Sequence, residues 1–457
     1  MKSICKLVIL GLIVSCIART ESAAQYIETN IALPPQASAR DLIYNPLNNK
    51  IYTANVPDVG MPAQKSVTII DGGLNSILTT LQVPEGPRDF CHNTQNNKIY
   101  VANYFADSIT VIDGQTDQII ALLPAGDGPR ALCYNSTDNK IYCANEFSGN
   151  VTVIDGVSNT IISTIPVGST PRVICYNNIS DKIYVPNAGS QNLSVISGSS
   201  NAVLATLPMG NVPRGIVFNP QSNWVYVSNY GSDNVKVVDG VTDAVVSTIT
   251  VGDGPTAMFH NPSGNKIYCS NVGAPGPNTP AACTISVIDA ASNTVVKTIT
   301  AGDEPTAFCY SPNNNKIYWV DEWSHRVSVA DAATNSIIMT ISLGTGQVQP
   351  VDLCYNPIHE RVYTANRLTY NLTVIKDSLT TTGISSPTIE NSLINIYPNP
   401  VDRVLYLNEK LRISVYSSNG QLMYKQVESS AHLDVTNLTP GLYLLVTEKG
   451  IKKFVKK

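Results

Sequence analysis

The stretch "NKIYVANYFADSITVIDG" at residues 97–114 contains two apolar runs joined by a short polar turn. Much the same phrase returns at 139–156 as "NKIYCANEFSGNVTVIDG". Its tyrosine occurs eight times along the chain, as Tyr52, Tyr100, Tyr142, Tyr184, Tyr226, Tyr268, Tyr318 and Tyr363. Successive tyrosines are mostly 42 residues apart, with longer steps of 45, 48 and 50. A repeat of about this length is typical of propellers and solenoids, in which each copy is one supersecondary unit.

One copy of the repeat, residues 128–168, divides into four short apolar runs. The segments between these runs are rich in Asn, Asp, Ser and Gly, which favour tight turns. Four strands joined by such hairpins predict one antiparallel sheet. Residues on both faces of each strand are largely apolar, so the sheet needs burial on both sides. Copies arranged radially around an axis satisfy this need, and the sequence therefore predicts an all-β propeller of four-stranded blades.

The two ends of the repeat region predict how the ring closes. Residues 26–34 resemble the fourth strand of a repeat, and the last unit, at 349–378, stops after its third strand. The N-terminal strand can therefore complete the last blade and spare the ring an unpaired edge. The count of tyrosines predicts eight blades; a ring of seven blades with one unit outside it is the alternative.

The cycle of "KIYVAN", "VTVIDG" and "TIxVG" motifs resembles the YVTN family of β-propeller repeats over roughly residues 26–376. The resemblance implies a propeller fold, because the motifs recur in phase. The resemblance implies little about catalytic activity or ligand. Propellers of this kind occur in surface-layer and cell-surface proteins, and related propellers serve as lactonases and quinoprotein dehydrogenases.

The last part of the chain has a different pattern. Residues 377–393 are Ser/Thr-rich and polar, as in a linker. Residues 394–457 contain several alternating strands, which predict a small β-sandwich. This segment resembles the type A C-terminal sorting domain of the type IX secretion system, through Tyr397, Pro398, Asn399, Pro400, Asn419, Gly420, Pro440, Gly441, Leu442, Tyr443 and the lysine-rich end. The resemblance implies passage across an outer membrane by the type IX machinery, often followed by removal of the domain.

Residues 1–24 are interpreted as an export signal. Lys2 and Lys6 precede an apolar run, and small residues before Gln25 offer a cleavage site. The alternative is a lipobox with a lipid attached at Cys16. Residues 25–376 would then form the exported propeller, either secreted or at the outer cell surface. No later stretch is long and apolar enough to span a bilayer. A formal net charge of −4 over 457 residues predicts no affinity for nucleic acid.

Eight cysteines follow the export signal. Five of them share one repeat position, which other units fill with Ile43, Val217 and Phe259: they are Cys91, Cys133, Cys175, Cys309 and Cys354. A position that accepts Ile, Val, Phe or Cys is an apolar core position, where a thiol packs as a small hydrophobe. We therefore expect free buried thiols. Cys269 and Cys283 flank one long turn and could form a disulfide, although Cys143 occupies the position of Cys269 without such a partner.

The sequence shows no set of residues that predicts catalysis, a metal site or a cofactor. The five histidines are scattered and lack spaced ligand partners: they are His92, His260, His325, His359 and His432. No nucleophile elbow, zinc motif or phosphate loop is present. One repeat position carries aspartates that we interpret as turn residues: Asp71, Asp113, Asp155, Asp239 and Asp289. Asparagines in glycosylation-type sequons, including Asn135, Asn150 and Asn192, are interpreted as ordinary turn residues.

One face of the predicted ring combines basic and aromatic residues. The loop that leads into each first strand shares a face with the loop between the second and third strands. Five successive units have an arginine in the former loop: Arg40, Arg88, Arg130, Arg172 and Arg214. The latter loops contain Tyr104, Phe105, Phe147, Tyr230, Trp323 and Tyr370, and the insertions at 56–65 and 272–283 belong to the same class of loop. Loop variation on one face of a rigid scaffold favours a binding site there.

These observations predict a non-catalytic binding or scaffold protein. Arginine forks and aromatic rings suit an extracellular glycan, a polypeptide or an acidic polymer. One alternative is an enzyme of the lactonase or quinoprotein type; another is a structural surface-layer module. A structural interpretation of the arginines also exists, in which each pairs with Glu85, Asp127 or nearby backbone and holds neighbouring units together.

Overall fold

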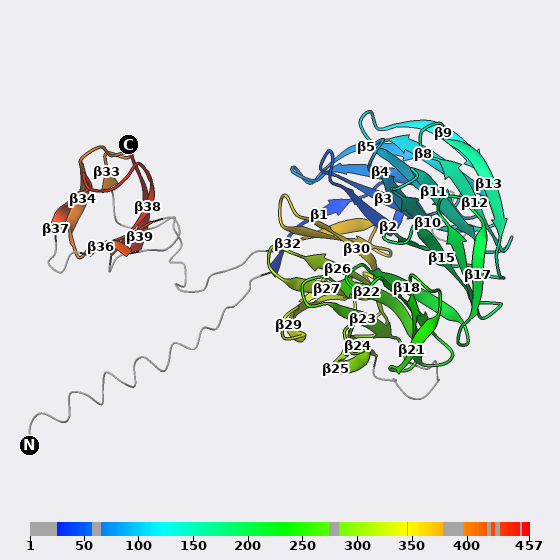
Figure 1. The fold of residues 1–457 in the computed structure, drawn as a ribbon. Coiled ribbons are helices and arrows are strands. Elements are labelled where there is room, and N and C mark those ends of the chain that lie inside the picture. The colour runs from blue at the N-terminus through cyan, green and yellow to red at the C-terminus, as the bar shows by residue number, and fades with distance from the viewer. Residues whose placement is uncertain are drawn as a thin grey trace, which may run out of the picture. The chain divides into compact units, whose positions relative to one another are not determined.

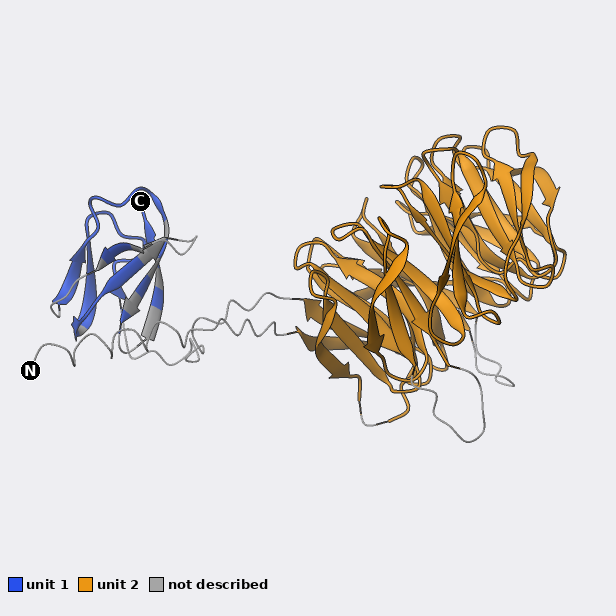
Figure 2. Cartoon of the chain, turned by 60° about the horizontal axis from the view of Figure 1, so that its bottom comes forward, with its two compact units in different colours: residues 1–22, 380–457 blue, residues 23–379 orange. Residues whose placement is uncertain are grey.

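The computed structural model describes residues 25–56, 65–273, 283–344, 346–377, 396–417, 422–425, 430–447 and 450–457. All regular elements in these ranges are strands, as predicted. The described ranges accordingly contain no helix long and apolar enough to cross a membrane. Two compact units are present, one of residues 23–379 and one that includes residues 380–457 (Figure 2). The expected export signal at 1–24, Cys16 and nearly all of the expected linker lie outside the described residues.

The first unit consists of antiparallel sheets of four strands each, and there are eight of them among its described residues. Sheet 1 contains β2 (Ser38–Asn45), β3 (Lys50–Val56), β4 (Ser66–Asp71) and β5 (Ser76–Gln82), and sheet 2 contains β6 (Pro87–Asn93), β7 (Lys98–Asn103), β8 (Ser108–Asp113) and β9 (Gln118–Pro124). Sheet 3 contains β10 (Pro129–Asn135), β11 (Lys140–Asn145), β12 (Asn150–Asp155) and β13 (Thr160–Pro166), and sheet 4 contains β14 (Cys175–Asn177), β15 (Lys182–Asn187), β16 (Asn192–Ser197) and β17 (Val203–Pro208).

Sheets 5 to 8 continue the pattern. Sheet 5 contains β18 (Pro213–Asn219), β19 (Trp224–Asn229), β20 (Asn234–Asp239) and β21 (Val245–Thr250), and sheet 6 contains β22 (Pro255–Asn261), β23 (Lys266–Asn271), β24 (Thr284–Asp289) and β25 (Thr294–Thr300). Sheet 7 contains β26 (Pro305–Ser311), β27 (Lys316–Asp321), β28 (Arg326–Asp331) and β29 (Ser336–Ser342), and sheet 8 contains β30 (Pro350–Asn356), β31 (Arg361–Asn366), β32 (Asn371–Asp377) and β1 (Gln25–Ala32).

The sheets are arranged in a closed ring. Each first strand contacts the first strand of the next sheet, and β30 contacts both β26 and β2. These first strands lie around the centre of the ring, and the fourth strands lie on its outside (Figure 1). The fourth strand of sheet 8 is β1, which pairs antiparallel with β32 from Gln25 opposite Asp377 to Ala32 opposite Asn371. The predicted closure by the N-terminal strand is confirmed.

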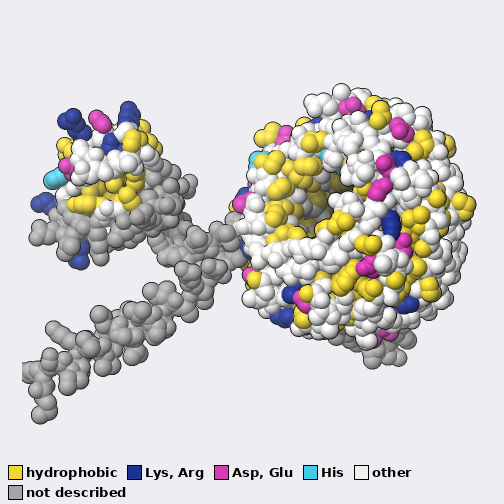
Figure 3. Space-filling model, viewed as in Figure 1, with side chains coloured by type: hydrophobic (Ala, Val, Ile, Leu, Met, Phe, Trp, Pro, Cys, Tyr) yellow, Lys and Arg dark blue, Asp and Glu magenta, His cyan; other side chains and the backbone are white. Residues whose placement is uncertain are grey.

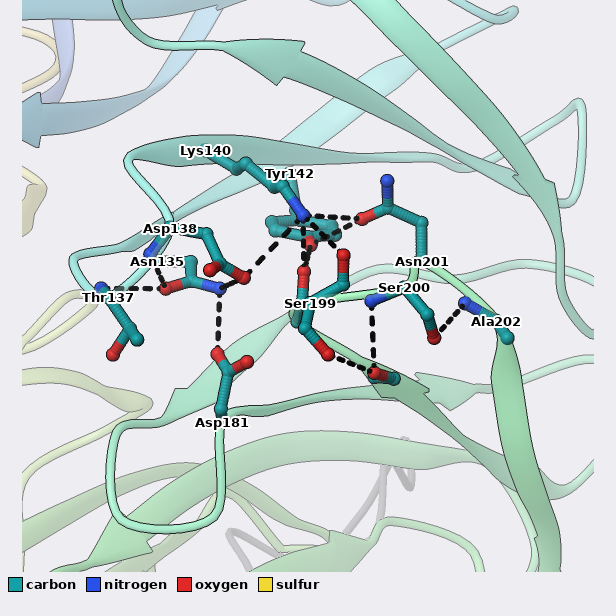
Figure 4. Close-up of polar contacts among 12 residues, drawn as sticks. Asn135, Thr137, Asp138, Lys140, Tyr142, Asp181, Ser199, Ser200, Asn201 and Ala202 are labelled. Atoms are coloured by element: carbon teal, nitrogen blue, oxygen red, sulfur yellow. Dashed lines mark hydrogen bonds and ion pairs between the residues drawn. The ribbon is translucent and has the colours of Figure 1, made fainter.

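In seven of the eight sheets, the hydroxyl of the recurring tyrosine donates to the next sheet. All eight tyrosine side chains are completely buried in the described structure. The Tyr142 hydroxyl donates to Asn201 Oδ1 at 2.8 Å, in the turn between the third and fourth strands of the next sheet. Lys140 of the same strand donates to the carbonyl of Ser199 in that turn at 3.0 Å, as Figure 4 shows. Between sheets 8 and 1, Tyr363 donates to Asn75 at 2.6 Å. The repeated Lys-x-Tyr therefore encodes contacts between sheets.

Asparagines form a second set of contacts between neighbouring sheets. Asn135, at the end of a first strand, donates to Asp181 of the next sheet at 2.9 Å (Figure 4). The same bond recurs around the ring in the pairs Asn45–Asn97, Asn93–Asn139, Asn177–Asn223, Asn219–Asn265 and Asn356–Asn49. Each such bond stabilises the fold by about 0.5–1.5 kcal/mol. Asn135 is thus a buried structural residue, in keeping with its interpretation as an ordinary asparagine.

The recurring aspartates have the role predicted for them in turns. The Asp71 carboxylate accepts hydrogen bonds from the backbone N–H groups of Gly73 and Leu74, at 2.7 and 2.9 Å. Asp113, Asp155, Asp239 and Asp289 bind their own turns in the same way. The backbone N–H of Thr116 is the main cause that lowers the pKa of Asp113. These carboxylates accept hydrogen bonds within their own turns and do not come together in one site.

The cysteines in the first unit are free thiols, as predicted. Cys91 and Cys143 pack in one apolar cluster between sheets 2 and 3, and Cys309 packs between sheets 7 and 8. Burial raises the pKa of these thiols and keeps them protonated. Cys269 and Cys283 form no disulfide; the Cys283 thiol donates instead to the carbonyl of Val272 at 3.2 Å.

The second unit has two sheets around one small core. One contains β33 (Ile396–Tyr397), β34 (Val404–Leu411) and β37 (Ser430–Asp434); the other contains β36 (Leu422–Lys425), β35 (Ser414–Ser417), β38 (Gly441–Thr447) and β39 (Gly450–Lys456). Leu405, Val415 and Phe454 are buried between them, which is the arrangement that the alternating strands predict. β35 and β36 pair antiparallel, and the predicted Asn419-Gly420 turn between them lies outside the described residues.

Candidate binding site at the mouth of the ring

The loops predicted to share a face are held together by backbone hydrogen bonds. In sheet 2, the N–H groups of Tyr104 and Phe105 donate to the carbonyls of Gly86 and Glu85, at 2.7 and 3.1 Å. Gly86 has a φ of +77°, and a Cβ at this residue would lie 2.7 Å from Cδ2 of Phe105. Only glycine tolerates both the left-handed backbone and the aromatic ring packed on it. The loop into β6 and the loop after β7 therefore form one rigid surface.

A β-bulge places four of the five arginines outside the regular strand pairing. In the pairing of β6 with β7, Pro87 lies opposite Asn103 and Asp89 opposite Ala102, so Arg88 is the extra residue. Arg40, Arg130 and Arg214 are skipped in the same way in sheets 1, 3 and 5. Bulges often re-aim a side chain at the edge of a sheet. We call the resulting opening the arginine mouth and define it by Arg40, Arg88, Arg130, Arg172 and Arg214. Figure 3 shows that the ring is hollowed near its centre.

Glu146 connects two of the arginines and one tyrosine. It follows β11 and is only 4% exposed. Its carboxylate accepts from Arg130 and Arg172 at 2.7 Å each and from the Tyr104 hydroxyl at 2.8 Å. Burial alone would raise the pKa of Glu146, but the hydrogen bond from Tyr104 and the charge of Arg130 lower it. Both arginines therefore pair with Glu146. The structural interpretation of the sequence had expected Glu85 or Asp127 as the partners.

Two other arginines stack on tyrosines. The guanidinium carbon of Arg88 lies 4.9 Å from the ring centroid of Tyr104, and that of Arg214 lies 5.0 Å from the centroid of Tyr230. Within the part of the chain that the structure describes, Arg88 and Arg214 form no ion pair. Burial and the nearby charge of Arg130 lower the pKa of Arg88. Stacking leaves the N–H groups of both arginines able to donate to a ligand.

Two adjoining cavities occupy the mouth. One, of about 630 Å³, is lined by Arg40, Asp41, Val56, Gly86, Pro87, Arg88, Tyr104, Phe105, Arg130, Val173, Thr306, Glu322, Val351 and Arg367. The other, of about 580 Å³, is lined by Asp89, Arg130, Arg172, Val173, Arg214, Gly215, Ile216, Thr256, Ala257, Met258, Val272, Glu304, Thr306, Ala307, Phe308 and Asp352. We call them the Phe105 cavity and the Arg214 cavity. Both volumes are within the range typical of small-molecule sites.

Three aspartates on the first strands lie deeper in these cavities, and the motifs recognised in the sequence do not include them. Asp41, Asp89 and Asp352 each follow the bulge position, on the neighbouring strands β2, β6 and β30. Asp352 accepts from the N–H of Leu42 at 2.7 Å, and Asp89 accepts from the N–H of Leu132 at 2.5 Å. The signal in the sequence was an Asp directly after the arginine position in three units, where the other five units have Ala, Val or Gly.

Burial raises the pKa of all three carboxyl groups. It raises the pKa of Asp89 to about 7. Burial is the largest cause of the raised pKa of Asp41, and the nearby charges of Asp352 and Asp89 raise it further. For Asp352, a hydrogen bond from Asp41 partly offsets the effect of burial. Near neutral pH this cluster therefore holds protons that ordinary aspartates would lose.

The remaining candidate residues lie at the edge of the mouth or away from it. Phe147 is 64% exposed and lies 5.6 Å from the Tyr104 ring, but it lines neither cavity. Trp323 is 54% exposed, and its indole N–H donates to Glu304. Tyr370 lies in the turn before β32, where its carbonyl accepts from Leu33 of the N-terminal segment. Most of the two insertions, residues 57–64 and 274–282, lies outside the described residues.

The histidines do not gather into a metal site. No group of three or more His, Cys, Asp or Glu residues in the described ranges is placed to hold a metal ion. His92 lies 3.2 Å from Asn97, and burial lowers its pKa. His325 accepts from the N–H of Gln349 at 3.2 Å through Nδ1.

Comparison with known families accounts for the second unit. Its cis-linked Tyr397-Pro398 and Asn399-Pro400 segment packs against the final strand, where Asn399 accepts from the N–H of Val455 at 2.9 Å. Tyr443 donates to the carbonyl of Thr439 at 2.8 Å and stacks on Phe454. Residues 395–457 match the family described as "Secretion system C-terminal sorting domain". The chain carries a type IX secretion sorting domain. It is therefore a secreted or cell-surface protein.

The propeller is supported by two further comparisons. Residues 119–244 match the family described as "Lactonase, 7-bladed beta-propeller". That name gives seven blades, whereas the described residues of the first unit form eight sheets. The solved structure of hydrazine synthase from Kuenenia stuttgartiensis is similar to this chain, with a TM-score of 0.52 and 16% sequence identity. The similarity covers 78% of this chain and 100% of that one, and at this identity it shows the fold alone. No curated protein sequence matches the chain.

Proposed function

We propose that the protein is an eight-bladed propeller that acts as a non-catalytic binding module at the cell surface or in the medium. Its ligand would be an extracellular glycan, polypeptide or acidic polymer that carries negative charge. The ligand would occupy the arginine mouth, and the type IX machinery would be a transient partner during export. Attachment through a lipid at Cys16 is the alternative to the free secreted form.

This proposal rests on which arginines of the mouth have a carboxylate partner and which do not. Arg130 and Arg172 share the single carboxylate of Glu146, whereas Arg88 and Arg214 stack on Tyr104 and Tyr230 and have no ion pair among the described residues. An arginine held by an aromatic ring keeps its charge and its donors for a ligand, and an ordered side chain loses little entropy on binding.

A charge-matched pair of variants tests the binding role. We expect R88Q/R214Q in the full chain to lose at least tenfold in affinity for anionic surface polymers, since each lost charge-assisted bond costs about 1.5–3 kcal/mol. K236Q/K297Q removes the same charge from β20 and β25 and should bind as the wild type does. Retention on immobilised surface polymer over a salt gradient measures both. Equal retention of the two variants would refute the proposal.

The localisation is tested separately. Deletion of residues 394–457 should leave a folded protein that stays in the periplasm, because the sorting domain carries the export address. Fractionation of cells and medium, with an antibody against the propeller, shows where the truncated chain accumulates. Normal appearance of the truncated chain at the surface would contradict this role of the tail.

A lactonase-like enzyme is the second candidate, because residues 119–244 match a lactonase family and three carboxyl groups with raised pKa lie in the cavities. A carboxylate with a pKa near neutrality can act as a general base. Hydrolysis of simple lactones by the full chain, abolished in D89N, would favour this candidate. Binding of anionic polymers without turnover would favour the first.

A further inference from the structure

The Phe105 cavity combines three kinds of chemistry on one wall. The first is a pair of arginines with donors to spare. Arg88 has no carboxylate partner among the described residues, and Nε of Arg367 is buried with no hydrogen-bond partner there. Arginine donors that lack a protein acceptor favour a ligand with a planar or tetrahedral anionic group, which a guanidinium binds in a bidentate manner.

The second kind is an exposed aromatic face. Phe105 is 65% exposed, although Gly86 packs on it and Tyr104 lies edge-on at 5.0 Å. The bond from its backbone N–H to the carbonyl of Glu85 holds the main chain of Phe105, and the ring packs against Gly86. A fixed and solvent-exposed ring offers dispersion contacts to a flat apolar surface of a ligand. A bare inorganic anion would leave this surface unused.

The third kind is a pair of carboxyl groups. Asp41 and Glu322 line the same cavity, and burial raises the pKa of both. Such groups accept hydrogen bonds from hydroxyls and, when protonated, repel an anion less than free carboxylates do. An acidic peptide would bring few hydroxyls to this wall.

We propose that the Phe105 cavity binds an acidic sugar unit, with the anionic group on Arg88 and Arg367, the ring over Phe105 and hydroxyls toward Asp41 and Glu322. This inference rests on the proposed binding function and names its ligand class. Among glycans, polypeptides and other acidic polymers, an acidic pyranose is the class that uses all three kinds of chemistry at once.

Trigalacturonate and its methyl ester form a matched pair of probes, because the ester keeps the rings and removes the charge. Calorimetry on the full chain should show at least tenfold weaker binding of the ester. R88Q and F105A should each weaken trigalacturonate binding about tenfold or more. F147A, an exposed phenylalanine outside both cavities, and K236Q should change it less than twofold. Melting temperatures confirm that each variant is folded.

Equal affinity for the ester, unchanged binding by F105A, or no binding of trigalacturonate would each overturn the inference. Poly-L-glutamate separates this failure from failure of the proposed function. If the chain binds poly-L-glutamate in a manner that R88Q/R214Q abolishes, but does not bind trigalacturonate, the mouth binds anions and the sugar assignment is wrong. If neither probe binds, the sugar assignment and the anionic mouth are both wrong.

Discussion

Glu146 and Glu322 occupy the same repeat position but experience opposite environments. Both are the residue that follows the second strand of a sheet, β11 in one case and β27 in the other. Glu146 accepts from two arginines and a tyrosine, which lower its pKa. Glu322 has its pKa raised by burial and by Glu304, which the charges of Arg367 and Arg40 only partly offset. Two glutamates that look equivalent in the sequence thus have different roles in the mouth.

The pair gives a matched test of stability. We expect E146Q to lower the free energy of unfolding by about 1–3 kcal/mol at pH 7, because it leaves two partly buried arginines without a counter-charge. A group with a lowered pKa in the folded state stabilises above its unfolded pKa, so this loss should shrink as the pH falls below about 4. E322Q should be neutral or slightly stabilising. Urea unfolding of both variants measures the difference; a larger loss for E322Q would contradict it.

At this scale the sequence predicted some features and missed others. The aspartates in turns and the free cysteines were predictable, because each depends on contacts within one repeat or on its apolar position. The shared bond of Arg130 and Arg172 to Glu146 was not, since it joins residues of sheets 3 and 4 through loop geometry. The bulge that aims Arg88 into the mouth also depends on register, which residue types alone do not determine.

Among the elements, the first strands of the sheets form the inner wall of the ring and contain its buried aspartates. β6 and β30 each place an aspartate that accepts from a backbone N–H of the next first strand, and β2 places Asp41 beside Asp352. An inner strand has one edge without a partner strand, and these carboxyls satisfy part of that edge. The sequence predicted the strands from their alternation and turns, but the aspartates were overlooked because they form no spaced motif.

Asp89 gives a prediction for pH dependence. Its pKa is about 7 in the folded chain and about 3.9 when unfolded. The folded state therefore binds the proton more tightly, and this group's contribution to stability falls as the pH rises from about 4 to 7. D89N keeps an acceptor for Leu132 and removes the charge. We expect the stability advantage of D89N over the wild type to be about 1–3 kcal/mol larger at pH 8 than at pH 5.

Thermal melts at the two pH values measure this difference, with D127N as the control, because Asp127 is exposed on the same face. A stability gain for D89N that is the same at pH 5 and pH 8 would show that Asp89 is not protonated in the folded protein at the lower pH.

For the whole molecule, the ring depends on both ends of the repeat region. β1 supplies the last strand of sheet 8, and Arg361 links it to sheet 1 by bonding Glu28 as well as the carbonyls of Gly72 and Gly73. This closure was predictable, because the final repeat lacks a fourth strand and the N-terminus supplies one. The ligand was not, since a propeller scaffold leaves function to its loops.

Deletion of residues 25–36 should therefore destabilise the whole first unit. It exposes the edge of β32 and removes the Glu28 contact, and neighbouring repeats transmit the loss. We expect a single melting transition at a temperature several degrees lower. Replacement of 25–36 by a polar linker of equal length controls for chain length. An unchanged melting temperature would contradict closure by β1.

The central claim is that the arginine mouth is the binding surface. Hydroxyl-radical footprinting of the full chain, with and without saturating anionic surface polymer, tests it without any substitution. We expect Phe105 to become protected from oxidation, while Leu47 and Ile179, exposed in the turns after the first strands, stay as reactive as before. Protection of Leu47 and Ile179 with no change at Phe105 would place the ligand on the opposite face and contradict the claim.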